Sequence, residues 1–445
     1  MKELKSNGRL VLMSPFLRSH YCKEILSEKI GANVTIAGWI EDIRPMGSLV
    51  FMTIRDKTGV SQVVFNKNKT SNEIFVLAKN VPRQSIVSLK GILSKGKGKN
   101  IPKEIQAKEM HVLGEAIHPL LLDPTGRVNA SIDTRLNARA LDLRNVKTMA
   151  IFKIRHIALQ SIHRTLSDEG FLEVNTAKII GQAAEGGATL FPFDYFGKDA
   201  FLAQSPQLFK EQLTMSLDRV FEIASYYRAE KSHTRRHLNE FISVDIEAAF
   251  AEKEDVMELA EKMVENATAE VIEKCSNELR TLEHKIEAPK RPFQKLTYTQ
   301  AINELNQEGI KIKDGDDLKD HDLQVLGKIH SEYFWIIDWP AKLKPFYIAR
   351  TTDGKKALSF DLQFGYLELS SGGKRVSDGK ELEERLKESG LSPKNFEDHL
   401  KTFRWGMPPH SGWGFGLDRF LMILTGMENI REVVLYPRDQ DRLLP

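Results

Sequence analysis

The chain is poor in cysteine, with only Cys22 and Cys275 among its 445 residues. Two cysteines cannot form a disulfide framework, so we expect a reducing compartment. No apolar run approaches the ~20 residues that a membrane-spanning helix needs. The basic start of the chain is only briefly apolar, is broken by Ser14 and Pro15, and lacks a small-residue cleavage site. These absences predict a cytoplasmic protein without a signal peptide.

The chain also lacks a strong excess of either charge and has no internal repeats. Its 64 Lys and Arg residues face 61 Asp and Glu residues, which gives a net charge of +3. A nucleic-acid partner is permitted, but its surface must be a local one. The composition, 41% apolar and 28% charged, is typical of globular proteins, and the length predicts two or three domains.

Neither of the common phosphate-binding loops is present, since the chain has no Walker loop and no GxGxxG after a strand. Residues 412–424 read GWGFGLDRFLMIL instead. Alternating glycines leave one face of a strand bare, so adenine could lie against the backbone. Arg419, at the start of the helix-like segment that follows, could then reach a phosphate. Packing alone would also explain glycines at a strand end.

Residues 33–113 predict a small barrel. Five short strands alternate apolar and polar residues, and a helical patch lies near residues 72–79. This pattern fits an OB-type barrel, whose exposed face commonly binds single-stranded nucleic acid. The Lys-Gly run at residues 94–100 suits either a phosphate-contacting loop or a solvated turn. Farther on, residues 151–166 have helical apolar spacing, and the apolar stripe of residues 253–275 predicts core packing.

Three polar segments carry the candidate chemistry. A cation-rich loop, RAEKSHTRRHLNEF at residues 228–241, lies between two expected strands. Asp361 and Glu368 stand seven residues apart without His or Cys neighbours, which favours Mg²⁺ shared with phosphate oxygens over zinc. The segment FLAQSPQLFKEQL offers polar groups to a small ligand: Gln204, Ser205, Gln207 and Lys210. Each of these residues could instead be a capping or surface residue.

Taken together, the segments resemble the class II aminoacyl-tRNA synthetases, and within them the aspartyl-tRNA synthetases of archaeal type. The resemblance runs from about Leu17 to Pro445. It is carried by GWIEDIRPMGSLVFMTIRDKTGVSQ, DTRLNARALDLR, AEGGATLF, FLAQSPQLFKEQL, RAEKSHTRRHLNEF, GMPPHSGWGFGLDR and YPRDQDRLLP. The order and spacing of these segments make the resemblance highly specific.

The resemblance implies how ATP is held. Arg228 would bind the α-phosphate and Arg419 the γ-phosphate, and these two arginines would be the catalytic residues. Glu230 would accept from the adenine amino group, His237 would lie near the terminal phosphates, and Gly416 would belong to the ATP site. Mg²⁺, the expected cofactor, would be held by three residues: Asp361, Glu368 and Ser371. ATP itself is a substrate.

The resemblance also implies an amino-acid pocket and an anticodon reader. The residues expected to bind aspartate are Glu185, Ser205, Gln207, Lys210, Asp245, Ser371 and Arg375. Within this set, Lys210 and Arg375 would meet the side-chain carboxylate. The segment GQAAEGGATL would be a mobile loop with a Gly186–Gly187 hinge. In the barrel, the residues expected at the anticodon are Arg44, Phe51 and Gln62.

The expected fold class is α+β and multidomain, with an N-terminal OB-fold β-barrel and a class II catalytic domain on an antiparallel sheet flanked by helices. The expected boundaries are an N-terminal extension 1–16, the anticodon-binding barrel 17–114, a hinge 115–144 and the catalytic domain 145–445. We expect a homodimer through the helix at about 148–167. Ala177 stands where the family has a proline, which puts the local dimer geometry in question.

The leading interpretation is an ATP-dependent ligase that forms aspartyl-tRNA from L-aspartate and tRNA(Asp), with tRNA(Asn) left open as a further substrate. One alternative is an asparaginyl-tRNA synthetase, although Lys210 suits a carboxylate better than an amide. A second is a tRNA-independent amide-forming ligase, which would not need the barrel. A third is a binding protein with an inactive catalytic domain, and the retained ATP residues argue against it.

Overall fold

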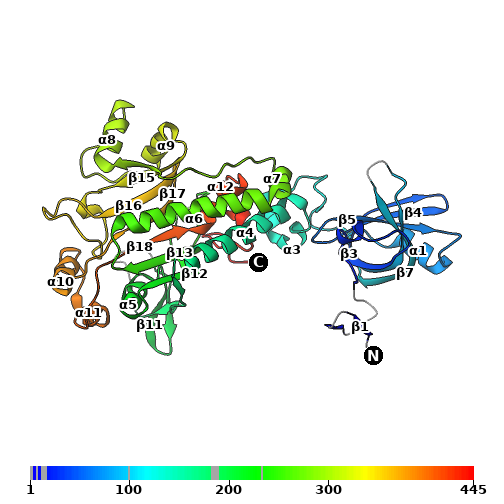
Figure 1. Ribbon diagram of the computed structural model, residues 1–445, viewed down its shortest axis with the longest axis horizontal. Helices are drawn as coiled ribbons and strands as arrows, with labels where there is room; N and C mark the ends of the chain where they lie inside the picture. The colour runs from blue at the N-terminus through cyan, green and yellow to red at the C-terminus, as the bar shows by residue number, and fades with distance from the viewer. Residues whose placement is uncertain (1–3, 7–8, 12–17, 99–100, 182–189, 232–233) are drawn as a thin grey trace. The chain divides into compact units, whose positions relative to one another are not determined.

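The computed structural model describes residues 4–6, 9–11, 18–98, 101–181, 190–231 and 234–445 (Figure 1). The chain forms two compact units, Met1–Ala130 and Ser131–Pro445. The division between them falls inside the segment expected to be a hinge. Among the described residues, no helix combines the length and the apolar character needed to cross a bilayer.

The first unit contains the expected five-stranded barrel. Its strands close in the order β3-β4-β5-β7-β6. Their bounds are β3 Asn33–Met46, β4 Leu49–Arg55, β5 Val60–Asn66, β6 Ile86–Lys95 and β7 Lys103–Gly114, and a helix, α1 Asn72–Asn80, lies between β5 and β6. Ser71 caps α1 by accepting a hydrogen bond from the backbone N–H of Ile74. The OB-type barrel is confirmed.

Strand alternation determines which barrel residues face outward. On β4, Val50, Met52 and Ile54 are fully buried in the barrel, so Phe51 between them points to the outer face. Two short strands, β1 Leu4–Ser6 and β2 Arg9–Val11, pair with each other ahead of the barrel.

The second unit is built on an eight-stranded sheet with the order β14-β15-β16-β17-β18-β13-β12-β8. Its strands are β8 Leu172–Glu173, β12 Arg219–Tyr227, β13 Glu240–Ala249, β14 Gln294–Thr297, β15 Tyr333–Ile337, β16 Ser359–Phe364, β17 Leu367–Lys374 and β18 His410–Gly416. The central pairs are antiparallel, and the outermost pair at each edge, β8 with β12 and β14 with β15, is parallel. A smaller sheet has the order β10-β11-β9, with β9 Ile179–Ile180, β10 Pro192–Tyr195 and β11 Lys198–Leu202.

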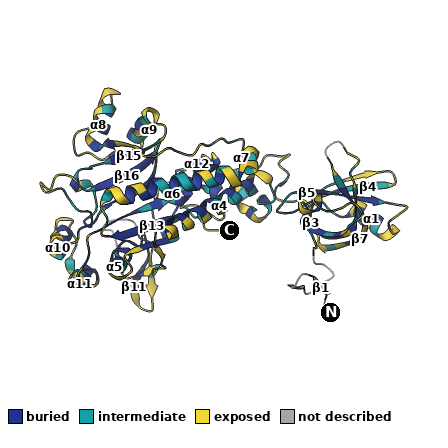
Figure 2. Cartoon of the chain, viewed as in Figure 1, coloured by how far each residue is buried: buried dark blue, intermediate teal, exposed yellow. Residues whose placement is uncertain are grey.

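Long helices cover one face of the large sheet. Figure 1 shows α4 (Val146–Asp168) and α6 (Lys253–Lys274) running side by side, and Figure 2 shows buried residues on their inner faces. The apolar stripe of α4 packs against α6 and α7 (Ser276–Leu282) inside the same chain. The predicted core role of the α6 stripe is confirmed, because Val256, Met263 and Val264 are buried.

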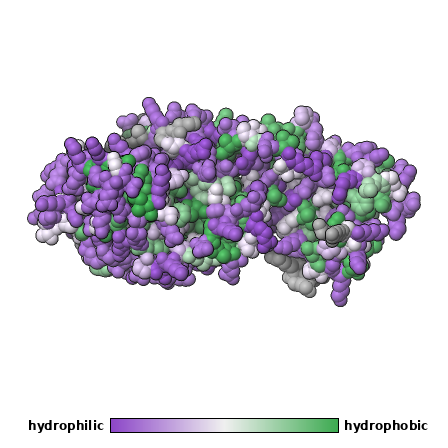
Figure 3. Space-filling model, turned by 90° about the horizontal axis from the view of Figure 1, so that it is seen from above, coloured by the Kyte–Doolittle hydropathy of each residue, from purple (hydrophilic) through white to green (hydrophobic). Residues whose placement is uncertain are grey.

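The remaining helices surround the sheet: α5 Gln207–Leu217, α8 Tyr298–Gln307, α9 Asp320–Ile329, α10 Gly379–Glu388, α11 Glu397–Phe403, α12 Leu417–Thr425 and α13 Ile430–Val433. Two smaller cores form beneath α8 and α9 and beneath α10 and α11. On the face seen in Figure 3, hydrophilic residues dominate and hydrophobic residues gather in small patches.

Part of the segment expected to be a hinge is helical. It forms α2 (Ile132–Asn137) and α3 (Arg139–Asp142) at the start of the second unit. Buried Arg139 donates hydrogen bonds to the carbonyl oxygens of Glu432 and Val434, at 2.9 and 2.7 Å. Because a buried guanidinium rather than an apolar stripe anchors these short helices, apolar periodicity did not reveal them.

Candidate active site

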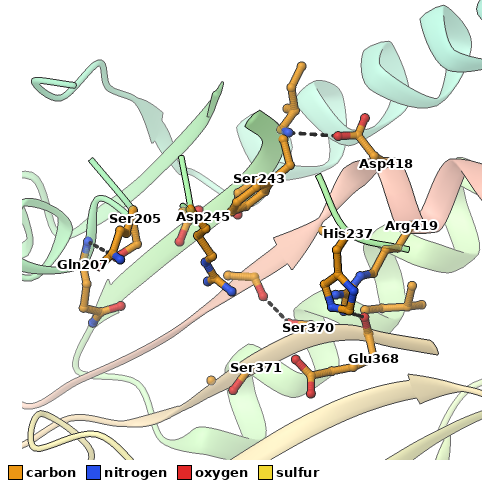
Figure 4. A pocket seen from close by; sticks show the side chains of 18 of the residues that line it. Ser205, Gln207, His237, Ser243, Asp245, Glu368, Ser370, Ser371, Asp418 and Arg419 are labelled. Atoms are coloured by element: carbon orange, nitrogen blue, oxygen red, sulfur yellow. Dashed lines mark hydrogen bonds between the residues drawn. The ribbon is translucent and has the colours of Figure 1, made fainter. Parts of the chain in front are cut away.

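A cavity of about 340 Å³ opens above the centre of the large sheet (Figure 4). Most of the residues predicted to bind ATP or aspartate line it: Ser205, Gln207, Arg228, Glu230, His237, Asp245, Glu368, Ser371, Arg375, Gly416 and Arg419. Neither Lys210 nor Asp361 is among the described residues that line the cavity. Glu185 and the Gly186–Gly187 pair lie outside the described residues, as do Ser232 and His233 of the cation-rich loop.

The cationic end of the cavity is formed by the β12–β13 hairpin and the start of α12. Asn239 fixes the hairpin by donating its side-chain amide to the carbonyl oxygens of Arg228 and Glu230, at 2.6 and 3.0 Å. The guanidinium of Arg228 lies over the ring of Phe241, 5.2 Å from its centroid. Arg419 donates to the carbonyl oxygen of Glu368 at 2.7 Å. These contacts orient two guanidinium groups toward one anion-binding region.

His237 completes this end. Its Nδ1 lies 2.6 Å from the hydroxyl of Thr234, so that hydroxyl fixes the ring. Burial, followed by the charge of Arg419, lowers the pKa of His237 below its ordinary value. The ring is therefore neutral at pH 7 in the free enzyme and offers a hydrogen bond rather than a positive charge.

At the opposite end, the two cations predicted for the aspartate side chain are buried against carboxylates of β13. Lys210 Nζ lies 3.0 Å from Asp245 Oδ1 and 3.6 Å from Glu247 Oε2. Arg375 donates to both oxygens of Glu247, at 2.9 and 3.2 Å. Glu247 was missed by the sequence reasoning. Its place two residues after Asp245 on a strand puts both carboxylates on one face, which is the signal that could have found it.

The predicted metal ligands come from β16 and β17. Asp361 and Ser371 are directly opposite each other in the antiparallel ladder, so their side chains share a face. Asp361 Oδ2 accepts from Lys344 Nζ at 2.6 Å, while Oδ1 is buried and has no hydrogen-bond partner among the described residues. Burial, followed by the nearby charge of Asp361, raises the pKa of Glu368. Sequence reasoning missed Lys344.

These residues fit Mg²⁺. An orphaned buried carboxylate oxygen beside a second carboxylate and a hydroxyl is an environment that a hard divalent cation relieves. In the described part of the chain, no group of three or more His, Cys, Asp or Glu side chains could hold a metal by itself. A bound ion would thus need oxygens from water or a phosphate as well, which is usual for Mg²⁺.

The three alternating glycines of β18 lie in two different environments: Gly412 packs against a buried carboxylate, whereas Gly414 and Gly416 face the cavity. A Cβ on Gly412 would lie 2.3 Å from Glu247 Oε2, so that glycine makes room for the buried carboxylate. Gly414 and Gly416 line the cavity. The bare strand face expected for adenine is therefore available only along the second half of the strand.

The residues predicted to bind the anticodon share the outer face of the barrel. Arg44 is directly opposite Phe51, and Thr53, two residues after Phe51, is opposite Gln62. Cross-strand partners and i, i+2 neighbours lie on one face, so Arg44, Phe51 and Gln62 are neighbours there. Gln62 donates its amide nitrogen to Glu104 Oε2 at 2.9 Å.

The chain matches two family models. Residues 131–440 match tRNA synthetases class II (D, K and N), and residues 34–113 match the OB-fold nucleic acid binding domain. The first match covers the cavity, and the second covers the barrel.

Curated relatives and solved structures agree with these matches. A protein of Methanothermobacter thermautotrophicus named Aspartate--tRNA(Asp/Asn) ligase is 43% identical over 98% of this chain and its own full length. A protein of the same name from Methanocaldococcus jannaschii is 44% identical, with 96% of this chain and 98% of the relative covered. The asparaginyl-tRNA synthetase of Pyrococcus horikoshii, solved with asparaginyl-adenylate, superposes with a TM-score of 0.90 at 32% identity, covering 96% of this chain and 99% of its own.

Proposed function

The chain belongs to the class II tRNA synthetases (D, K and N), and on that premise we propose that it activates L-aspartate with ATP and transfers it to tRNA. The observation that carries this proposal is the cavity itself. It joins a cationic end, suited to a triphosphate, to an end with two buried cations, suited to a small dicarboxylate. Because the relatives are named for tRNA(Asp/Asn), tRNA(Asn) is proposed as a second acceptor beside tRNA(Asp).

The first step needs no general base. The α-carboxylate of aspartate is already a nucleophile, and one of its oxygens attacks the α-phosphorus of ATP as the bond to pyrophosphate breaks. Catalysis then consists of alignment and of neutralising charge on the phosphates. Arg228 binds the α-phosphate and Arg419 the γ-phosphate. Glu230 accepts from the adenine amino group, and His237 donates to a terminal phosphate.

Asp361, Glu368 and Ser371 would hold Mg²⁺, which would supply positive charge to the pyrophosphate leaving group. Lys344, whose ammonium contacts Asp361, holds that carboxylate in place. In the second step, a terminal hydroxyl of tRNA attacks the carbonyl carbon of aspartyl-adenylate, and AMP leaves.

The aspartate is held by its two ends. Ser205, Gln207 and Asp245 take the ammonium and main-chain atoms, and Ser371 and Glu185 belong to the same set. Arg375 reaches the side-chain carboxylate directly from the cavity wall, and Lys210 adds its charge from beneath Asp245. We propose that the enzyme is a cytoplasmic homodimer whose barrel binds the anticodon.

Activation of asparagine is the alternative to test directly, because a similar solved structure is an asparaginyl-tRNA synthetase. In addition, Asp245 and Glu247 already pair with the cations of the pocket, which weakens the attraction for a second carboxylate. The experiment is ATP–pyrophosphate exchange with aspartate and with asparagine, followed by charging of purified tRNA(Asp) and tRNA(Asn). We expect exchange with aspartate and little with asparagine. The reverse preference would identify the rival activity, and exchange without charging of either tRNA would rule out the transfer step.

A further inference from the structure

Behind the amino-acid pocket, a buried carboxylate faces two histidines. Glu211 lies on α5 one turn after Gln207 and is fully buried, at 0% exposure. Its Oε1 accepts from Gln207 Nε2 at 2.6 Å. Its Oε2 faces the Nε2 atoms of His399 on α11, at 3.3 Å, and of His410 on β18, at 3.6 Å. None of these three groups is used in the proposed reaction.

The surroundings of His410 identify its protonation state. Its Nδ1 lies 2.8 Å from the carbonyl oxygen of Pro408, which can only accept, so that nitrogen carries a proton. Its Nε2 lies 3.6 Å from Glu211 Oε2, a charge contact in which neither atom has a hydrogen-bond partner among the described residues. A neutral ring would turn a lone pair toward that carboxylate, whereas an imidazolium presents an N–H to each acceptor. Burial alone lowers the pKa of His410, but Glu211 and then Glu247 raise it overall above its ordinary value.

His399 needs no charge to satisfy its neighbours. Its Nδ1 lies 3.2 Å from the amide nitrogen of Gln212, which can donate to it. The ring proton then sits on Nε2 and points to Glu211. His399 and His410 therefore both turn a ring nitrogen toward one carboxylate, at ion-pair distance but without hydrogen-bond geometry. Burial alone would raise the pKa of Glu211, but the two histidines lower it overall.

The charged groups of this region form one network. It contains three cations and three carboxylates on the elements packed against the pocket: Lys210, Arg375 and His410, with Asp245, Glu247 and Glu211. The backbone N–H of Arg375 donates to the carbonyl oxygen of His410 at 2.9 Å, so His410 is tied to a residue of the cavity wall. With all six groups charged, the network is neutral. Loss of the proton from His410 would leave it with one negative charge.

We propose that His410, held as an imidazolium by Glu211, is a positioning residue that supplies the third positive charge of the amino-acid site and makes aspartate binding depend on pH. The inference rests on the proposed function, because a net negative network repels aspartate, whose net charge is −1, more than it repels a neutral amino acid. As the pH rises through the raised pKa of His410, the positive charge is lost, so KM for aspartate increases.

Glu211 has a second effect through Gln207. Because a carboxylate can only accept, it fixes the nitrogen of the Gln207 amide on its own side. The amide oxygen then faces the pocket, as Figure 4 shows, where it can accept from the ammonium group of the substrate.

The decisive experiment restores charge balance. We expect His410→Gln to raise KM for aspartate about tenfold, the effect of roughly 1.4 kcal/mol, with kcat and KM for ATP nearly unchanged. The double variant His410→Gln with Glu211→Gln removes one charge of each sign and should return KM to within about threefold of the parent enzyme. If KM for aspartate in the double variant rises by the product of the two single effects or by more, the residues are merely structural and the proposal is overturned.

Two controls accompany the variants. Glu261→Gln makes the same change at a buried carboxylate that accepts from the indole N–H of Trp335, and it should leave KM for aspartate unchanged. Inhibition by asparagine, which has no side-chain charge, should hardly respond to His410→Gln. An equal loss of affinity for asparagine and aspartate would contradict an electrostatic role.

If the variants do not fold, the parent enzyme still tests the proposal. KM for aspartate should increase with pH while the inhibition constant of asparagine stays flat, and parallel curves would overturn the inference alone. Exchange supported by asparagine but not by aspartate would overturn the proposed function and this inference together. The two failures are therefore distinguishable.

Discussion

Lys210 and Arg375 form a buried charge cluster with Asp245 and Glu247 beside the amino-acid end of the cavity. Their cationic character was predictable from the sequence segments, and their place near the amino-acid site was predictable only through the family resemblance. Their pairing with Asp245 and Glu247 was not, because it depends on strands β13 and β17 and helix α5 meeting in space. The same holds for Glu211, whose partners come from α11 and β18.

The first prediction concerns Lys210. We expect Lys210→Gln to lower kcat/KM for aspartate by ~10²–10³. KM for ATP should stay nearly unchanged, because Lys210 pairs with Asp245 and Glu247 of the amino-acid end and has no contact with Arg228 or Arg419 among those recorded for the described residues. The loss of one partner of a buried ion pair costs about 3–5 kcal/mol. Initial rates of ATP–pyrophosphate exchange measure the effect.

A matched control separates selectivity from stability. Lys253 also forms an ion pair, with Asp338 at 2.9 Å, but its partner is not among the described residues that line the cavity, whereas Asp245, the partner of Lys210, is. Lys253→Gln should leave the kinetics of both substrates unchanged. Near-parental aspartate activation by Lys210→Gln would remove the main physical support for aspartate over asparagine.

Among the elements, the segment before β9 is anchored to β12 by a buried carboxylate. Glu222 on β12 is buried, and its two oxygens accept from the backbone N–H and the hydroxyl of Thr176, each at 2.7 Å. It also accepts from Lys178 Nζ at 2.7 Å and from the Tyr226 hydroxyl at 2.6 Å. The segment around Ala177 is thus held by a carboxylate, where the resemblance led us to expect a proline.

The second prediction is that Glu222→Gln lowers the free energy of unfolding by about 2–4 kcal/mol, because charge-assisted bonds are lost in a buried site. Burial alone would raise the pKa of Glu222, but Lys178, Tyr226 and Thr176 lower it below its ordinary value. A lowered carboxyl pKa stabilises the fold above the unfolded-state pKa, and this stabilisation is lost as the pH falls through the folded-state pKa.

Urea unfolding of the parent and the Glu222→Gln variant should therefore differ at pH 7 and converge as the pH falls below about 4.5, the unfolded-state value. A difference that stays constant with pH would show that the carboxylate charge contributes nothing. As control, Glu261→Gln keeps an acceptor for Trp335 and should show a smaller change at pH 7.

The helices and strands that could be predicted from the sequence are those whose apolar residues repeat at a regular spacing. The barrel strands and helices α4 and α6 repeat apolar residues every two or every three to four positions, and each formed as expected. Helices α2 and α3 were missed because polar anchoring by Arg139 leaves no such period. The cavity could be predicted only through family resemblance, since its residues come from segments far apart in the chain.

For the whole molecule, the third prediction concerns assembly. The apolar stripe of α4 was expected to form the dimer contact, but it is buried within the chain. Exposed apolar residues remain on β8, at one edge of the large sheet, where Leu172 is 52% exposed, and on β9 of the smaller sheet, where Ile179 is 49% exposed. Sheet edges and exposed apolar patches mark association surfaces. We therefore expect a homodimer through this edge.

Sedimentation velocity should show a dimer for the parent protein at micromolar concentration and a monomer for Leu172→Lys. Ile329 provides the matched control. It is an exposed residue of α9, which precedes β15, near the end of the sheet order opposite β8, and Ile329→Lys should remain dimeric. An active parent monomer would contradict the dimer itself, whereas a dimeric Leu172→Lys would place the contact elsewhere.

The division into two compact units yields the last prediction. Activation of aspartate uses residues of the second unit, whereas Phe51 lies on the outer face of the barrel in the first. If Phe51 stacks on an anticodon base, its loss costs ~1–3 kcal/mol of tRNA binding. Phe51→Ala should therefore weaken tRNA charging about tenfold or more while ATP–pyrophosphate exchange is kept.

Leu113→Ala, at an exposed apolar residue of the same barrel, is the control and should leave charging intact. Equal losses of charging and exchange by Phe51→Ala would mean that Phe51 serves folding, because only a folding defect reaches both activities at once.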